Sequence, residues 1–249
     1  MIKFFRTIRR RLLSSGKMSN YFLYALGEIA LVMVGILLAL QVNNWNSERL
    51  QRKEIRTKYE RLKGELESTS TSVKRKANLI DSLLITSNQR SLELLVLRNE
   101  DSIQRLHESL EAITKVITVS YDMPATSEFL QAGYLSSIDN ERIKTLLLNL
   151  RRSISFGTVV DDYAKNQLNT LIEPYVIQHI NYAQMVKGRS MKVVNPTTDF
   201  TVFFDDLQLE NLLNLKIETD ITKIDYLRTF STLLDRTIEE IDLELKEKE

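Results

Sequence analysis

The side chains that most often carry chemistry are scarce in this sequence. Its 249 residues include no cysteine and only two histidines, His107 and His179, which excludes a thiolate nucleophile, a disulfide and a cysteine-based metal centre. Two acidic pairs, Asp161-Asp162 and Asp205-Asp206, occupy adjacent positions, and adjacent residues on a helix point about 100° apart. We therefore expect the first pair to be a solvated helix start and the second to cap a helix, with no metal site.

The remaining polar candidates favour ordinary structural roles. His179 lies near Tyr175 and Tyr182 and is expected on a helix surface or hydrogen-bonded, His107 at the edge of an amphipathic helix, and Arg151-Arg152 at a solvated helix end. Glycine-rich phosphate loops, H-E-x-x-H pairs, nucleophile elbows and EF-hand loops do not occur in the sequence. The sequence predicts no catalytic residue and no cofactor, so we do not expect an enzyme.

Glu28 is the unusual ionisable group, because it lies inside an otherwise apolar run, "YFLYALGEIALVMVGILLALQVNNW". Residues 22–42 carry this single charge and measure roughly 31 Å as a helix, enough to cross a bilayer core. Tyr21 and Tyr24 at one end and Trp45 at the other match the aromatic belts of membrane interfaces. No small-x-small cleavage site follows, which predicts an uncleaved transmembrane helix over residues 21–45.

Glu28, Gly35 and Ala39 fall on one stripe of this helix, at positions i, i+7 and i+11. Gly35 and Ala39 form a small-xxx-small pair, which lets two helix backbones approach closely. An acid within a span costs on the order of 2–3 kcal/mol and usually faces protein or water. We therefore expect a helix–helix interface on this stripe. The alternatives are a lone anchor, whose acid hydrogen-bonds locally or reaches toward the headgroups, and a proton or ion pathway.

Charge divides the chain into three parts. Residues 1–20 are expected to be a cytoplasmic leader that lies against lipid headgroups, because they contain six basic residues and no acid: Lys3, Arg6, Arg9, Arg10, Arg11 and Lys17. Residues 46–249 form the expected extracytoplasmic domain. Beyond residue 42 the chain holds 28 of its 34 basic and 32 of its 33 acidic residues, a balance that disfavours nucleic-acid binding. Basic residues are equally numerous on both flanks of the span, so the acid-free leader decides this orientation.

Four motifs near the N-terminus carry a resemblance: Ile-Lys-Phe-Phe-Arg at residues 2–6, Gly-Glu-Ile at 27–29, Gly-Ile-Leu-Leu-Ala-Leu-Gln at 35–41 and Asn-Asn-Trp-Asn at 43–46. The first 46 residues resemble an uncharacterised family of single-pass membrane proteins from flavobacteria and other Bacteroidota. A weaker echo occurs at "FLQAGYLSSIDNERIKTLLLNL". The resemblance implies a bacterial inner-membrane anchor with a helical domain in the periplasm, and it implies no activity.

The outer domain is expected to be an elongated antiparallel helical bundle of about four long helices, so the predicted fold class is all-α. Only seven glycines and three prolines occur, which disfavours a sandwich or a barrel. Two segments carry a heptad-like apolar pattern, the first running from Ile55 to Leu84 and the second from Ile224 to Leu245. We expect these stripes to pack within the chain, and the first and last helices to pair; a coiled coil between subunits is the alternative.

Local signals predict the intervening elements. A helical segment is expected from Gln89 to Val119 with a break at residues 99–102, after which Asp101 or Ser102 should cap the new start, and Asp139 is expected to cap another helix. Pro124 should open a short helix that ends at Gly133, and a long helix bent at Pro174 should run from Gly157 to about residue 186 and end at Gly188. The last helix is expected from Asp220, and two β-rich runs predict a small hairpin near residues 190–205.

Together these features favour an interaction or scaffold protein over other classes. It would sit in the lipid bilayer and assemble with itself or with a membrane complex through the transmembrane stripe and the heptad-like helices. The alternative is an extracytoplasmic ligand-sensing bundle, which would need a separate transducer because the leader is too short for a signalling domain. The sequence names no small-molecule ligand.

Overall fold

The computed structural model describes residues 18–136, 138–186, 191–193 and 197–247, and the chain divides into two compact units, 1–58 and 59–249. The described residues form helices and irregular connections without a strand, which confirms the predicted all-α class. Residues 190 and 194–196 of the predicted hairpin lie outside this description. The second half of the predicted hairpin is wrong, because Phe200–Asp205 forms the 3-10 helix η4.

The described part of the first unit belongs to α2, which spans Met18–Leu79. Thirteen large apolar side chains between Phe22 and Val42 are each more than half exposed. A helix that is apolar on all sides and leaves these side chains exposed is suited to a lipid environment. One helix near the N-terminus is therefore long and apolar enough to span a membrane.

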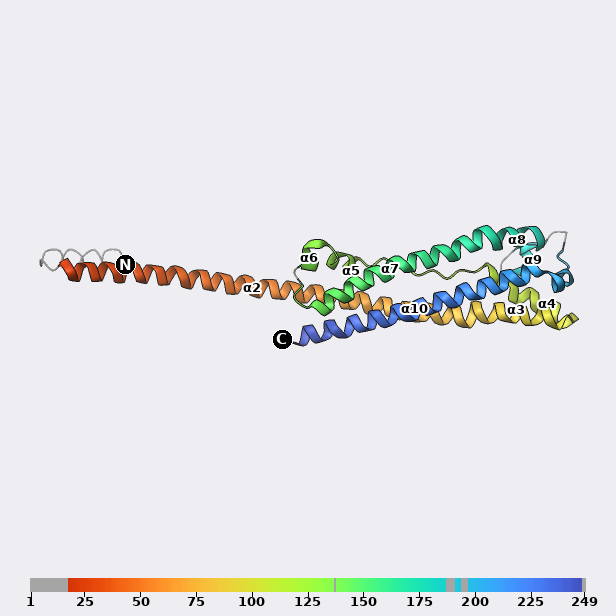
Figure 1. Ribbon diagram of the computed structural model, residues 1–249, viewed down its shortest axis with the longest axis horizontal. Helices are drawn as coiled ribbons and strands as arrows, with labels where there is room; N and C mark the ends of the chain where they lie inside the picture. Colours follow the sequence, from red (N-terminus) through yellow and green to blue (C-terminus); the bar gives the residue numbers. More distant parts are fainter. Residues whose placement is uncertain (1–17, 137, 187–190, 194–196, 248–249) are drawn as a thin grey trace. The chain divides into compact units, whose positions relative to one another are not determined.

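Three helical rods run alongside one another in the second unit (Figure 1). The first rod is residues 59–97, in which the last part of α2 passes through the π-helical turn η1 (Ile80–Ile85) into α3 (Thr86–Leu97). The second is α7 (Glu141–Gln167), the π-helical turn η3 (Leu168–Ile172) and α8 (Glu173–His179). The third is α10 (Leu207–Glu247).

Polar contacts show that α10 runs antiparallel to the first rod. Ser70 donates to Asp235 at 2.7 Å, and Lys63 pairs with Asp242 at 2.6 Å, so α2 and α10 pass in opposite directions. The heptad-like residues of both helices, from Tyr59 to Leu84 and from Ile224 to Ile241, are mostly buried in these contacts. The prediction that the first and last helices pair within one chain is confirmed.

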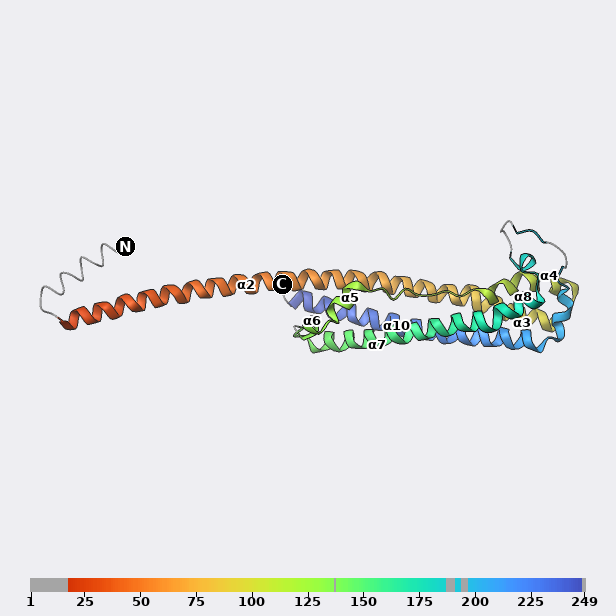
Figure 2. The ribbon, with the colours of Figure 1, turned by 90° about the horizontal axis from the view of Figure 1, so that it is seen from above.

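An extended segment, residues 115–123, returns along the bundle where the sequence predicted more helix (Figure 2). The helix expected to reach residue 119 ends earlier, because α4 (Glu100–Ser109) is followed by the 3-10 helix η2 (Leu110–Thr114). Lys76 Nζ donates to the Thr118 carbonyl oxygen at 2.6 Å, which ties the extended segment to α2. The second unit therefore contains three long rods and this extended segment, where about four long helices were expected.

Short helices connect these parts: α5 (Pro124–Phe129), α6 (Ala132–Ser136) and α9 (Tyr182–Met185). Pro124 opens α5 as predicted, although that helix ends at Phe129, before Gly133. The Glu65 carboxylate accepts hydrogen bonds from the Ala125 and Thr126 backbone N–H groups, each at 2.8 Å. An acid from α2 thus completes the unsatisfied first turn of α5 and fastens it to the bundle.

Two predicted helix caps and two predicted helix bounds are corrected by the structure. Asn99 caps α4, in place of Asp101 or Ser102, and Asn140 caps α7, in place of Asp139. In both cases an asparagine oxygen accepts from backbone N–H groups of the first turn. The second rod ends at His179, before the predicted residue 186, and α10 begins at Leu207, thirteen residues before Asp220. Gly188 lies outside the described residues.

Gly157 lies inside α7, which corrects the prediction that a new helix begins after it. A Cβ atom at this position would lie 2.2 Å from the Tyr226 hydroxyl and 2.6 Å from atoms of Tyr121. Tyr226 donates to the Ser153 carbonyl oxygen at 3.0 Å, and Tyr121 belongs to the extended segment. Glycine is therefore required here because two phenol groups cover the helix backbone closely.

We expect Gly157→Ala to lower the free energy of unfolding by about 1–3 kcal/mol, because the added methyl group must displace both phenols. Gly64→Ala is the matched control, since Gly64 also lies inside a helix, α2, and its added Cβ would meet no atom within 4 Å. That change should stabilise the helix by about 0.5–1 kcal/mol. Urea unfolding of the detergent-solubilised chain, followed by circular dichroism, measures both. Equal effects at the two glycines would contradict the close phenol packing.

Candidate functional site

The predicted transmembrane interface lies on α2 in the first unit. Glu28 is partly exposed, whereas Gly35 and Ala39 are exposed, and an added Cβ on Gly35 would meet no atom within 4 Å. Because α2 is helical throughout, offsets of seven and eleven residues place all three within about 20° of one line. One acid and two small residues thus share one face of α2.

The other membrane-contacting residues are described only in part. Trp45 is 59% exposed, and the Arg49 guanidinium lies 5.9 Å from the centre of its ring, a cation–π arrangement. The side chains of Tyr21 and Tyr24 lie outside the described part of the chain. So do all six basic residues that were expected to bind lipid headgroups: Lys3, Arg6, Arg9, Arg10, Arg11 and Lys17.

A layer of buried polar side chains crosses the second unit between α7 and α10. None of its six members is more than 6% exposed: Asp161, Gln167, Lys216, Thr219, Asp220 and Lys223. We call this set the polar layer. Its two lysines and two aspartates balance in formal charge, as buried charges must because an unpaired charge in a protein interior is severely penalised.

Asp161 connects three separate parts of the fold. One of its carboxylate oxygens forms an ion pair with Lys223 of α10, and the other accepts the Val119 backbone N–H at 3.0 Å. Asp161 itself belongs to α7, while Val119 belongs to the extended segment. The prediction that Asp161-Asp162 is a solvated pair holds only for Asp162, whose side chain is 65% exposed and pairs with Lys165.

The second ion pair of the polar layer lies within α10. Lys216 Nζ contacts Asp220 Oδ2 at 2.5 Å, one helical turn away. Burial lowers the pKa of Lys216, and the Asp220 charge only partly opposes it. Burial likewise raises the pKa of Asp220 against the opposing charges of Lys216 and Lys223. Beside this pair, Gln167 donates to the Thr219 hydroxyl at 2.8 Å, which joins α7 to the same stretch of α10.

Asn88 adds a further buried polar group on the first rod. The side chain is 0% exposed, and neither its amide nitrogen nor its oxygen has a hydrogen-bond partner among the described residues. Counting along the antiparallel helices from the Ser70–Asp235 contact places Asn88 opposite residues 216–223 of α10. The first rod therefore buries an amide at this level of the bundle, and an unsatisfied buried group costs about 1–3 kcal/mol of stability.

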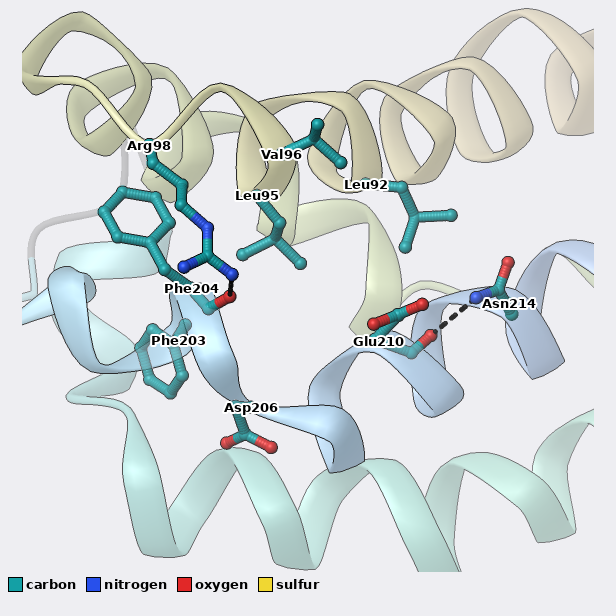
Figure 3. A pocket seen from close by; sticks show the side chains of 9 residues that line it. All are labelled: Leu92, Leu95, Val96, Arg98, Phe203, Phe204, Asp206, Glu210 and Asn214. Carbon is teal, nitrogen blue, oxygen red and sulfur yellow. Dashed lines mark hydrogen bonds between the residues drawn. The ribbon is translucent and has the colours of Figure 1, made fainter.

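A cavity of about 350 Å³ lies between α3 and the start of α10, toward the end of the unit where η4 precedes α10 (Figure 3). Leu92, Leu95 and Val96 line it from α3, and Phe203 and Phe204 from η4. The polar residues that line it are Arg98, Asp206, Glu210 and Asn214. No local sequence pattern marks this cavity, because its lining comes from segments more than a hundred residues apart.

Asp206 occupies the helix-capping position that was expected of the second acidic pair. Its Oδ1 accepts the backbone N–H groups of Gln208 and Leu209 at 2.8 and 3.0 Å, which caps α10. Its Oδ2 accepts the Tyr175 hydroxyl at 2.7 Å. Desolvation would raise the pKa of Asp206, but these donors together outweigh it, so that pKa lies below its usual value. The carboxylate is held in its charged form and has a structural role.

The histidines and the arginine pair occupy surface or boundary positions. His179 is exposed, stacks on the Tyr175 ring at 4.5 Å and contacts the Tyr175 carbonyl oxygen at 2.9 Å. His107 is half-buried against the edge of Phe200. Arg151 and Arg152 are exposed as expected, but they lie inside α7 and not at a helix end. Among the described residues no group of three or more histidine, cysteine, aspartate or glutamate side chains is arranged to hold a metal ion.

Comparisons with known proteins assign no relative to this fold. No protein-family model matches the chain, and neither the curated proteins nor the solved structures contain a match.

The Asp161–Lys223 pair gives a direct test of the polar layer. We expect Asp161→Asn to reduce the free energy of unfolding by about 3–5 kcal/mol, because it leaves the Lys223 ammonium buried without its anion. Asp162→Asn, the exposed neighbour, should change it by less than about 0.5 kcal/mol. Thermal and urea unfolding of the full-length chain measure both variants.

A double variant separates charge from hydrogen bonding. Asp161→Asn combined with Lys223→Met removes the unpaired charge, while the asparagine oxygen can still accept the Val119 N–H. We expect this combination to recover most of the stability that Asp161→Asn alone loses. A loss at Asp161 no larger than that at Asp162 would show that the buried ion pair is unimportant to the fold.

Proposed function

We propose that this chain is a single-pass membrane protein that acts as a helical scaffold. It assembles with itself or with a membrane complex through Glu28, Gly35 and Ala39 of α2. The observation that supports this proposal is that an acid lies on one stripe with two small residues. The apolar side chains of the same helix segment are exposed. A second helix at this stripe would place the acid against protein, where acids within a span usually lie, and the two small residues would let the helix backbones approach closely.

The packing of the second unit limits which residues are available for assembly. The heptad-like residues Tyr59, Leu62, Leu66, Val73 and Leu84 are each at most 3% exposed, so they are occupied within the chain. A coiled coil between subunits would require the bundle to open. We therefore assign the association to the transmembrane stripe alone. The bundle is the domain that the transmembrane helix tethers to the membrane.

We further propose that the anchor lies in a bacterial inner membrane, with the basic leader in the cytoplasm and the bundle in the periplasm. The acid-free leader and the family resemblance of residues 1–46 support this placement. A fusion reporter that is active only in the periplasm, attached after residue 249, tests the orientation. The leader-in arrangement predicts an active reporter at this position, and a silent one would reverse it.

The cavity between α3 and α10 supports a second candidate function, a ligand-sensing bundle that works with a separate transducer. Its volume of about 350 Å³ falls within the range of small-molecule sites, and its lining combines apolar walls with a few polar groups. The two functions are compatible, because the stripe on α2 could contact a transducer as well as a second copy.

The stripe makes a specific prediction about assembly. We expect Ala39→Leu to shift the chain from an assembly to a smaller species, because added bulk separates the two helix backbones. Ala30→Leu is the matched control: it adds the same bulk about 200° around the helix from Glu28, on the opposite face. Native mass spectrometry of nanodisc-reconstituted protein, with co-purifying chains identified, measures the species present.

Substitutions of the acid complete this test. Glu28→Gln keeps a hydrogen-bonding amide and should retain most of the assembly, whereas Glu28→Leu should lose it. If Ala39→Leu and Glu28→Leu leave the assembly unchanged, or if the wild-type chain is a monomer without partners, the scaffold proposal fails.

A further inference from the structure

The cavity between α3 and α10 has a lining with two distinct chemical parts (Figure 3). One wall is aliphatic and comes from α3, which contributes Leu92, Leu95 and Val96. The other wall comes from the first two turns of α10, where Glu210 and Asn214 lie on the side that faces α3. A ligand that fills this space must therefore be apolar along one side and polar at one end.

The charges already present in the cavity decide the sign of that polar end. Arg98, the basic lining residue, is occupied: its Nη2 donates to the Phe204 carbonyl oxygen at 2.8 Å and pairs with Asp205 at 2.7 Å. Asp206 has both oxygens engaged, by two backbone N–H groups and by Tyr175. Glu210 is exposed at the wall, and no described side chain neutralises its carboxylate.

Asn214 supplies a second acceptor next to this carboxylate. Its Nδ2 donates to the Glu210 backbone carbonyl oxygen at 3.0 Å, which fixes the side chain and leaves its amide oxygen available. A carboxylate and an amide oxygen on one wall, four residues apart on a helix, accept hydrogen bonds and donate none from these atoms. An anion is disfavoured here, whereas an ammonium group with three N–H donors is complementary.

We propose that this cavity binds a small primary alkylamine. The ammonium donates to the Glu210 carboxylate and the Asn214 amide oxygen, and the carbon chain lies against Leu92, Leu95 and Val96. Neutral molecules of the same shape lack the charge-assisted hydrogen bond, and they leave the carboxylate partly desolvated without a partner. This inference goes beyond the scaffold function and does not depend on the stripe of α2.

Isothermal titration of the full-length chain in nanodiscs with n-butylamine tests the proposal. We expect saturable binding with a Kd on the order of 1 mM, as suits a ligand of so few atoms. The same titration with n-butanol should show no saturable binding, because it has the chain without the charge. Empty nanodiscs correct for partition of either molecule into lipid.

Two variants locate the site, and one serves as a control. Glu210→Gln should weaken n-butylamine binding by about tenfold or more, the loss expected when a charged hydrogen-bond partner becomes neutral. Val96→Lys alters a side chain that is 79% exposed and should abolish binding by placing a competing ammonium at the opening, without disturbing the core. Glu218→Gln, an acid of α10 that does not line the cavity, should bind like the wild type.

The outcomes are decisive in either direction. Binding that falls in Glu210→Gln and Val96→Lys but persists in Glu218→Gln supports an amine site at this cavity. Absence of saturable binding to the wild-type chain, equal binding of n-butanol, or unchanged binding in Glu210→Gln would each overturn it. None of these results bears on assembly through α2, so failure here and failure of the scaffold proposal can be told apart.

Discussion

The fold of the second unit depends on the burial of one carboxylate. Asp161 lies in α7, pairs with Lys223 of α10 and accepts the backbone N–H of Val119, so it joins two rods to the extended segment that runs beside them. An extended chain along a helical bundle has backbone groups that no helix satisfies, and they must find partners elsewhere. The Asp161 carboxylate provides one such partner, and its ion pair with Lys223 requires α7 and α10 to meet in a single register.

Apolar side chains are mostly buried within the chain in the second unit and are mostly exposed in the first. In the second unit α10 packs against both other rods, and the periodic apolar residues of the first rod are covered within the chain. In the first unit α2 leaves its apolar residues uncovered, which suits a lipid surrounding. Because the periodic apolar residues of the bundle are buried within the chain, the proposed association is assigned to the stripe on α2 that contains Glu28.

Sequence periodicity predicted the long helices, because apolar residues at every third or fourth position line up on one face only when the chain is helical. The caps at Asn99 and Asn140 were missed by one to three residues because each lies near an aspartate or serine that caps equally well. Gly157 and Asp161 were misinterpreted for another reason. Each depends on a tertiary neighbour, the phenols of Tyr121 and Tyr226 in one case and Lys223 in the other, and no local pattern marks such contacts.

Disulfide crosslinking in native membranes tests the central claim most directly, because the chain contains no cysteine and each introduced thiol is unique. A cysteine substituted at Ala39 lies on the stripe with Glu28, and one substituted at Leu37 lies about 200° away around the helix, only about 3 Å along its axis. Assembly through the stripe predicts rapid oxidation of Ala39→Cys to a covalent dimer, or to an adduct with a partner chain, and little reaction of Leu37→Cys. Equal crosslinking at both positions, or at neither, would contradict it.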